Sequence, residues 1–429
     1  MSKISCLPVS HCLLLACVVF VTELTAQDNA TMIPTDDAIT LFESRIKKNE
    51  QDYASRTLLG RLHLRRAGEE DRFEDYVTAE AHFRKALIAK PDYLAARTYL
   101  ASALSAQHRF SEAAEAAEEV LAAKPQSTMA LASLADACLE LGQWDRADQV
   151  LHRLGKLNQS PPVLVRQARL KELRGMHENA IALLRRAEEE HARFDSAGHG
   201  WYQWRIGRGC FVAGQLDEAD RWFEAALKTN PDDAHSIAGR AAVSAARGDY
   251  ELAITGYLAA VEKLPSPPLM AALGDVCERA GDGEQAVGWW DKAEAIIIAE
   301  AGDNSSRIAH AREAAVFFAD HRRRLSLAVE LARADLRQRQ DPVGYDTLAW
   351  ALHQSGKSRK AQEWIGRALE ASQDIPKIHY HAGVIAYTIG DRTSAISHLQ
   401  RALELNPHFS LRGTVIAGEL LRTLEQDAS

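Results

Sequence analysis

Small, bulky and helix-ending residues recur along the chain at a fixed interval, and from Trp201 to Pro265 one pattern of such residues occurs twice. With His199 and Asp233 each taken as place zero, the eighth place is small and the twenty-fourth is aromatic. Glycine stands at the fifteenth place, alanine at the twentieth and twenty-seventh, and proline at the thirty-second. The places hold Gly207, Gly214, Ala219, Phe223, Ala226 and Pro231, then Ala241, Gly248, Ala253, Tyr257, Ala260 and Pro265. A period of this length predicts a repeated unit of two short helices joined by a turn.

The spacing has a physical reason. Two antiparallel helices approach closely only where their side chains are small, which explains the small residues at the eighth and twentieth places. The aromatic residue at the twenty-fourth place then fills the space between one hairpin and the next. Glycine at the fifteenth place suits the left-handed backbone that ends a helix, and proline cannot continue one. Because each hairpin leaves an apolar face uncovered, the pattern predicts a stack of hairpins.

The same residue types occur along most of the chain. The first hairpin begins near Tyr53, but its second helix arrives seven residues late, and the excess lies in the charged stretch Ala67–Tyr76. We interpret that stretch as a loop or a helix extension, since repeats tolerate insertions. From Pro91 to Pro125 the period is 34 residues.

The residue types at these places resemble those of the tetratricopeptide repeat, over residues 53–407. The resemblance implies an all-α fold, a right-handed α-solenoid superhelix of about ten stacked hairpins whose first helices line a concave face. It also implies binding of a protein or peptide in that groove, and it implies no chemistry. The pattern departs from the family's after the third, fourth and seventh hairpins, where proline is missing, and in the eighth, at about 307–340, which matches poorly.

The chain divides into predicted segments on this basis. Residues 27–52 form a short polar lead and a first helix from Asp36 to Lys48. A block of about seven hairpins covers residues 53–300 and a block of about three covers 301–407, because Glu294–Ser306 ends in turn residues. Residues 408–429 form a final helix that caps the open end of the stack.

Residues 1–26 have the features of a secretory signal. Lys3 is basic, Leu13–Val21 is apolar, and Leu24-Thr25-Ala26 offers a cleavage site before Gln27. The apolar run is shorter than the roughly 20 residues that a spanning helix needs. An N-terminal buried helix is the alternative. We therefore expect an exported protein of bacterial type, periplasmic or secreted, with no membrane span after cleavage.

Cys17 follows Leu14-Leu15-Ala16 and resembles a bacterial lipoprotein cleavage box. Leucine directly before that alanine is uncommon in such a box, and apolar residues continue past the cysteine. Lipid anchoring at Cys17 is therefore the alternative to cleavage before Gln27.

Composition and cysteine positions agree with a helical stack. Lys and Arg number 51 against 59 Asp and Glu, a net charge of −8 that argues against a general nucleic-acid binder. Cys138, Cys210 and Cys277 each occupy the eleventh place of their repeat, which is a buried position. Three thiols in three hairpins are too far apart to bridge, so we expect free cysteines.

The chain lacks the common catalytic and cofactor motifs. It contains no His-Glu-x-x-His, Cys-x-x-Cys, phosphate-binding loop or Gly-x-Ser-x-Gly elbow. His379 and His381 are two residues apart on a predicted helix and point to different sides, so they do not share a metal. We predict no catalytic residue, no metal and no cofactor.

The second, fifth, ninth and twelfth places of each first helix are expected to line the concave groove. Exposed aromatic residues beside arginine favour binding hot spots, although aromatic residues also pack against neighbouring helices. The candidate partner-binding residues are Trp201, Trp204, Arg208, Trp350, His353, Tyr380 and Tyr387.

Two classes of function follow from these observations. The first is a non-catalytic scaffold or adaptor that binds a protein or peptide outside the cytoplasm. The alternative is an enzyme or enzyme accessory subunit whose chemistry lies in the non-repeat insertions, or a membrane-tethered lipoprotein assembly factor.

Overall fold

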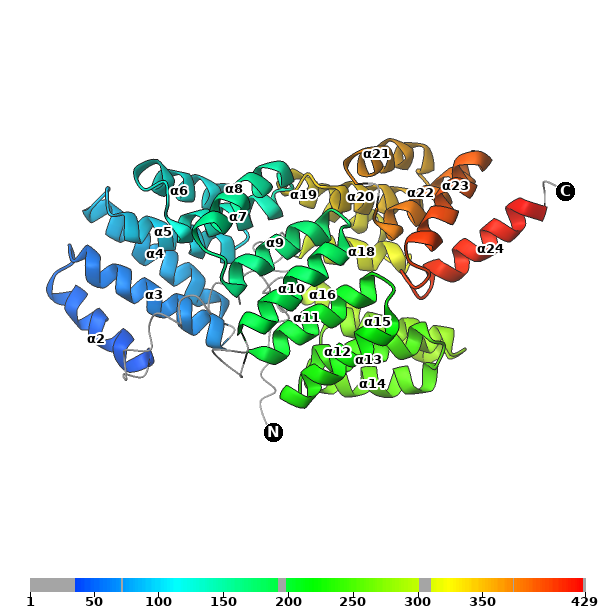
Figure 1. Ribbon diagram of the computed structural model, residues 1–429, viewed down its shortest axis with the longest axis horizontal. Coiled ribbons are helices and arrows are strands. Elements are labelled where there is room, and N and C mark those ends of the chain that lie inside the picture. Colours follow the sequence, from blue (N-terminus) through cyan, green and yellow to red (C-terminus); the bar gives the residue numbers. More distant parts are fainter. Residues whose placement is uncertain (1–34, 71, 192–197, 301–309, 373, 427–429) are drawn as a thin grey trace. The chain divides into compact units, whose positions relative to one another are not determined.

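A computed structural model describes residues 35–70, 72–191, 198–300, 310–372 and 374–426 (Figure 1). The predicted signal sequence, Cys17 and almost all of the polar lead lie outside these residues. Within them the chain forms 22 helices and no strand. The all-α prediction is confirmed.

The chain divides into two compact units, Met1–Arg166 and Gln167–Ser429. The predicted break near residue 300 falls inside the second unit, and residues 301–309 are not described, so the two-block division stays a prediction.

In the first unit, consecutive helices pair as hairpins, α3 with α4, α5 with α6 and α7 with α8, and α2 packs on α3. The bounds are α2 (Thr35–Lys48), α3 (Tyr53–Glu70), α4 (Phe73–Ala89), α5 (Leu94–Ala106), α6 (Phe110–Ala123), α7 (Thr128–Glu140), α8 (Trp144–Leu157) and α9 (Pro161–Leu173), which contains the boundary.

The second unit continues the same pairing. Its hairpins are α11 with α12, α13 with α14, α15 with α16, α18 with α19, α20 with α21 and α22 with α23, while α24 packs on α22 and α23. The bounds are α10 (His177–His191), α11 (His199–Val212), α12 (Leu216–Thr229), α13 (Ala234–Ala246), α14 (Tyr250–Lys263), α15 (Pro267–Arg279), α16 (Gly283–Glu300), α18 (Ala311–Asp320), α19 (Leu325–Gln338), α20 (Pro342–Gln354), α21 (Ser358–Ala371), α22 (Pro376–Ile389), α23 (Arg392–Leu405) and α24 (Gly413–Gln426).

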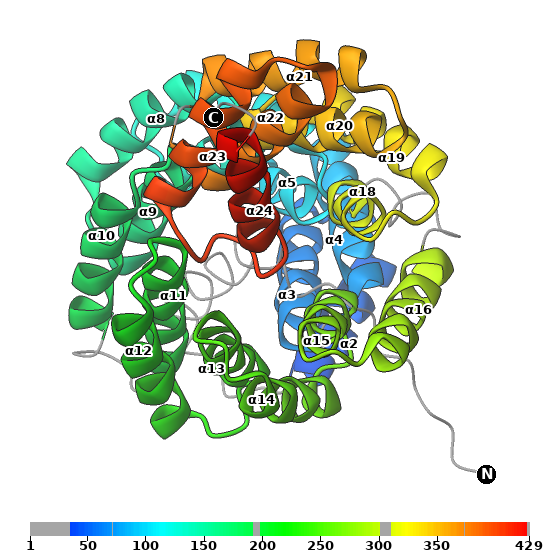
Figure 2. The same ribbon diagram turned by 90° about the vertical axis from the view of Figure 1, so that its right-hand side faces the viewer.

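Within the second unit the hairpins follow a curve whose inner side is made by the first helix of each pair (Figure 2). The curve brings helices that are distant in sequence into contact. The evidence is a hydrogen bond of 2.8 Å, in which Asn406 Nδ2 donates to the carbonyl oxygen of Val212. The groove of this unit is the inner side of the curve.

The glycine at the fifteenth place has the predicted role. Seven such glycines follow the first helix of their hairpin with φ between 73° and 91°, the left-handed conformation that glycine adopts without strain. They are Gly142, Gly175, Gly214, Gly248, Gly281, Gly356 and Gly390. In the hairpins α5 with α6 and α18 with α19, no glycine ends the first helix. There His108 and Arg322 take the left-handed backbone, with φ of 58° and 55°.

Two local features differ from or refine the sequence pattern. The charged insertion in the first hairpin is a helix extension, since α3 continues to Glu70 and α4 begins at Phe73. The final helix begins at Gly413, later than the predicted residue 408. The side chains of Asn406 and Ser410 accept hydrogen bonds from the backbone of His408 and Gly413, which stabilises an irregular turn before the helix.

The contact between small and bulky residues is tighter than the repeat pattern alone indicates. A Cβ atom added to Gly207 would lie 2.8 Å from the ring of Phe223, and one added to Gly239 of the next hairpin would lie 2.6 Å from the same ring. The aromatic residue therefore fills the space between two hairpins, as predicted. Ala180, Ala219 and Ala253 are buried where the helices meet.

The three described cysteines are buried at the predicted places. Burial raises the pKa of the Cys138 and Cys210 thiols to about 11, and that of Cys277 is also raised by burial. The thiols are therefore protonated at neutral pH and pack as small apolar groups.

We expect Gly207→Ala to destabilise the protein by about 1–3 kcal/mol, because the new methyl group overpacks the contact with Phe223. The control is Gly288→Ala on α16, where no described atom lies within 4 Å of the added Cβ. That change should leave stability equal or raise it by up to about 1 kcal/mol through helix propensity. The measurement is the urea midpoint of unfolding for each variant. An equal shift of the midpoint in both variants would contradict the predicted overpacking at Gly207.

Candidate partner-binding groove

Helix α11 carries aromatic residues and an arginine at the positions predicted to line the groove. Ile206, Gly207 and Cys210 are buried on its core side, whereas Trp204 is half-buried and Arg208 is exposed. The periodicity of the helix places these two sets on different faces. We define Trp201, Trp204 and Arg208 as the α11 strip.

Neighbouring side chains hold the rings of the α11 strip in place. The Trp204 ring lies 5.2 Å from the ring of His235 on α13, measured between centroids. The guanidinium carbon of Arg205 lies 5.7 Å from the centroid of Trp201. Both rings are thus held by neighbouring side chains and keep part of their surface accessible.

A buried ion pair lies under the α11 strip. Arg205 is buried and its Nη2 donates to Glu172 Oε1 at 2.9 Å. Burial alone would raise the pKa of the Glu172 carboxyl, but the charges of Arg205, Arg208 and Arg169 hold it below its usual range. Arg208 is exposed, and the carboxylate that its charge stabilises already has a partner in Arg205.

The other predicted site residues gather on α20 and α22, and two of them are buried. Trp350 is 6% exposed and Tyr380 is 5% exposed. Trp350 stacks between His353 and His381 with ring centroids 5.1 and 4.0 Å away, and its ring lies 5.8 Å from that of Tyr380. The structure gives Trp350 and Tyr380 packing roles, and they offer a partner little surface. Tyr387, 39% exposed, lies at the end of α22.

A charged cluster on the inner helices was not among the predicted site residues. Asp320 Oδ1 accepts a hydrogen bond from Trp350 Nε1 at 2.8 Å, and Asp320 Oδ2 pairs with Lys377 Nζ at 3.0 Å. Burial would raise the pKa of the Asp320 carboxyl, but the charge and hydrogen bond of Lys377, together with His381 and His321, lower it below its ordinary value. His381 Nδ1 lies 2.8 Å from Asp346 Oδ1. No sequence signal marks Asp320, since it lies in the hairpin that matches the repeat worst.

His379 and His381 lie as their spacing predicts. His379 Nδ1 is 3.1 Å from His398 Nδ1, while His381 pairs with Asp346 on another helix. In the part of the chain that the structure describes, no group of three metal-ligating side chains is placed to hold an ion. None of the described helices has both the length and the hydropathy that a membrane span needs.

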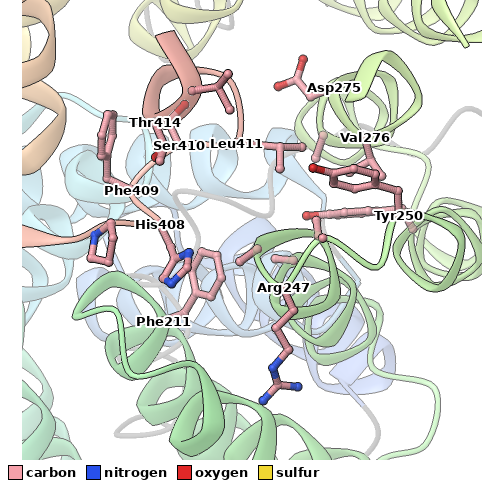
Figure 3. Close-up of a pocket in the computed structure, with 18 residues that line it drawn as sticks. Phe211, Arg247, Tyr250, Asp275, Val276, His408, Phe409, Ser410, Leu411 and Thr414 are labelled. Atoms are coloured by element: carbon pink, nitrogen blue, oxygen red, sulfur yellow. The ribbon is translucent and has the colours of Figure 1, made fainter. Parts of the chain in front are cut away.

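A cavity of about 370 Å³ opens on the inner side of the second unit (Figure 3). Its walls come from α11, α13, α14 and α15 on one side and from the chain between α23 and α24 with the start of α24 on the other. The lining is mainly apolar and aromatic, with Asp275 as its carboxylate. Arg247 points its guanidinium away from the cavity and pairs with Asp217. Phe211, Tyr250, Tyr257 and Phe409 supply the rings.

The repeated hairpins and the lined groove define an α-solenoid of helical-hairpin repeats. The chain belongs to the tetratricopeptide repeat family: two family models, each described as tetratricopeptide repeat, match residues 72–126 and 104–173 and residues 206–268 and 347–408. Together the matched segments cover slightly more than half of the chain. Repeats of this family suggest a protein-interaction scaffold. A search of curated proteins found no match to the sequence.

Solved structures with similar folds share little sequence with this chain. A tetratricopeptide repeat protein from Parabacteroides merdae is 16% identical, with a TM-score of 0.36 over 62% of this chain and 100% of its own. Yeast Tom70 is 13% identical, with a TM-score of 0.34 over 88% of this chain and 96% of its own. The human IFIT1 dimer with PPP-AAAA is 14% identical, with a TM-score of 0.43 over 88% and 96%.

We expect Asp320→Asn to lower stability near neutral pH, because Lys377 and Trp350 then lose their charged partner. A carboxyl whose folded-state pKa is depressed stabilises the fold above its ordinary pKa, here 3.8, and that contribution is lost as the pH falls through the folded-state pKa. The difference in unfolding free energy between wild type and variant should therefore shrink at about pH 3 relative to about pH 7.

The measurement is urea unfolding at both pH values. The control is Glu363→Gln, which changes an exposed carboxylate on α21 and should show a small difference that varies less with pH. The assigned pairing would be contradicted if Asp320→Asn lowered the free energy of unfolding by the same amount at neutral and at acid pH.

Proposed function

We propose that the protein is a non-catalytic scaffold or adaptor that binds an extended segment of a partner protein in the groove of the second unit. The observation that carries this proposal is the α11 strip, where Trp201 and Trp204 are half-buried beside the exposed Arg208. Tryptophan and arginine are the residues most enriched where truncation costs the most binding energy.

The remaining parts of the proposal rest on the family and on the charges of the groove. Membership in the repeat family supports binding of protein partners. The carboxylates of the groove already have partners within the stack, since Asp320 pairs with Lys377 and Asp275 Oδ1 lies 2.9 Å from His321 Nε2. We therefore assign them to holding the inner helices, and the sequence lacks the common catalytic motifs.

The location proposed for this scaffold is outside the cytoplasm. The support is the basic residue and apolar run of the first 26 residues, with small residues before Gln27.

We expect the double substitution Trp204→Ala with Arg208→Ala to reduce partner capture at least about tenfold, the effect of losing about 1.4 kcal/mol or more at a hot spot. Capture is measured by crosslinking in cells followed by purification and mass spectrometry. Helicity by circular dichroism should stay unchanged, because neither side chain belongs to the buried core.

The matched control is Arg221→Ala with Trp222→Ala on α12. It removes the same two residue types from the outer helix of the same hairpin, and capture should be retained. Equal capture by both double variants would place the binding surface elsewhere.

The mature N-terminus tests the proposed export. We expect intact-mass analysis of protein purified from its own cells to show a chain that begins at Gln27. A chain that begins at a lipid-modified Cys17 would instead establish the lipoprotein alternative, and an uncleaved chain would contradict export by a signal peptide.

A further inference from the structure

The groove of the second unit is partly filled by the chain itself. Residues 406–412, which we call the inner segment, connect α23 to α24 and lie on the inner side of the curve (Figures 2 and 3). Asn406 Nδ2 donates to the carbonyl oxygen of Val212 on α11, a residue 194 positions earlier. The inner segment therefore contacts helices far from it in sequence.

The inner segment places two side chains in distinct sites. The ring of Phe409 lies 5.3 Å from the ring of Tyr380 on α22, and it also lines the cavity. The guanidinium of Arg412 reaches α15, α16 and α18. Its Nε lies 2.8 Å from Glu278 Oε2, its Nη1 donates to the Asp320 carbonyl oxygen at 3.0 Å, and its carbon lies 5.6 Å from the centroid of Trp290.

The site around Arg412 is selective for a guanidinium. One carboxylate, one carbonyl and one indole face surround it, and a planar cation with several donors can satisfy all three at once. Lys377 pairs with the side-chain carboxylate of Asp320, whereas Arg412 uses the backbone carbonyl oxygen of the same residue. An arginine side chain therefore suits this site better than a lysine.

The fit of the inner segment to the groove is incomplete. The cavity of about 370 Å³ remains beside it, in a region that a well-matched ligand would fill. The pair that anchors it is also accessible to solvent, with the Arg412 and Glu278 side chains 29% and 39% exposed. Atoms that line an empty space lose dispersion contacts, so a segment that fills it better would bind more tightly.

We propose that the inner segment is an internal ligand of the groove and that the partner displaces it with a segment of the same chemistry that adopts a similar turn, an aromatic residue followed three positions later by arginine. This inference rests on the proposed function. The inner segment then sets the lowest affinity at which a partner can bind, because the partner competes with a segment held at high effective concentration.

A peptide copied from the chain tests the proposal. The probe is a fluorescein-labelled peptide of residues 406–415, titrated with the full-length protein and followed by fluorescence anisotropy. In the variant Phe409→Ala with Arg412→Ala the groove loses its internal competitor. We expect that variant to bind the peptide at least about tenfold more tightly than wild type. In the wild type, only the fraction of molecules whose groove is not occupied by the inner segment can bind the peptide, and the apparent affinity is reduced by that fraction.

The control variant is Arg422→Ala, which removes an exposed arginine from α24 and should bind the peptide as weakly as wild type. A charge swap tests the arginine site. Glu278→Arg in the double-variant background should abolish binding of the native peptide and restore binding of a peptide that carries Arg412→Glu. Equal affinity of wild type and double variant, or failure of the double variant to bind, would overturn the proposal.

A second measurement keeps the test valid if the double variant fails to fold. Unlabelled peptide is added in excess to the wild-type protein, and amide hydrogen exchange is followed by mass spectrometry. We expect faster exchange in residues 408–413 once the inner segment is displaced, and no change there would overturn the proposal.

The outcomes also separate this inference from the proposed function. If Trp204 and Arg208 are required for partner capture but the peptide does not compete with the inner segment, the scaffold stands and the internal ligand is wrong. If capture is independent of the α11 strip, the proposed function is wrong, whatever the peptide does.

Discussion

The close approach of helices across a missing side chain is the constraint on which the rest of the structure depends. Phe223 lies between two hairpins, and glycine on both sides leaves the space that its ring fills. Within their own hairpins, Gly383 leaves space for Leu399 and Gly274 leaves space for Trp290. A hairpin therefore presents a bulky residue that only the next hairpin can cover, which couples the repeats and makes the stack continuous.

The close approach of helices requires small residues at fixed places within each repeat. Because those places can be read from the sequence, most of the fold could be predicted. The glycines at the fifteenth place and the alanines at the twentieth have the conformations and burial that the spacing indicates. The start of α24 was predicted too early, because the side chains of Asn406 and Ser410 hold the preceding turn. A sequence pattern of apolar residues does not distinguish such a turn from a first helical turn.

The candidate site was less predictable, for a different physical reason. Trp204 and Arg208 follow from the helical period alone. Trp350 and Tyr380 share that period but are buried, because His381 and Phe409 cover them, and those contacts depend on the local packing of three elements. The pairing of Asn406 with Val212 depends on the curvature accumulated over several hairpins, which no single repeat encodes.

The same curvature relates the fold to the account of binding. A stack that curves far enough brings its last connection against an inner helix from the start of the curve, as the contact of Asn406 with Val212 shows. Asn406 and Arg412 anchor it with polar contacts, while the cavity beside it stays unfilled. The groove is thus formed and partly covered by one continuous chain, and its accessibility depends on how strongly the inner segment is held.

The most direct test of this account is a photo-crosslink from the inner segment in the intact protein. His408, which lines the cavity, is replaced by p-benzoylphenylalanine, and the linked residues are identified by mass spectrometry after irradiation. If the inner segment occupies the groove, intramolecular links should form to the cavity-lining residues of α11, α13 and α15. Links confined to α22 and α23, or links between two molecules, would contradict the claim that the chain occupies its own groove.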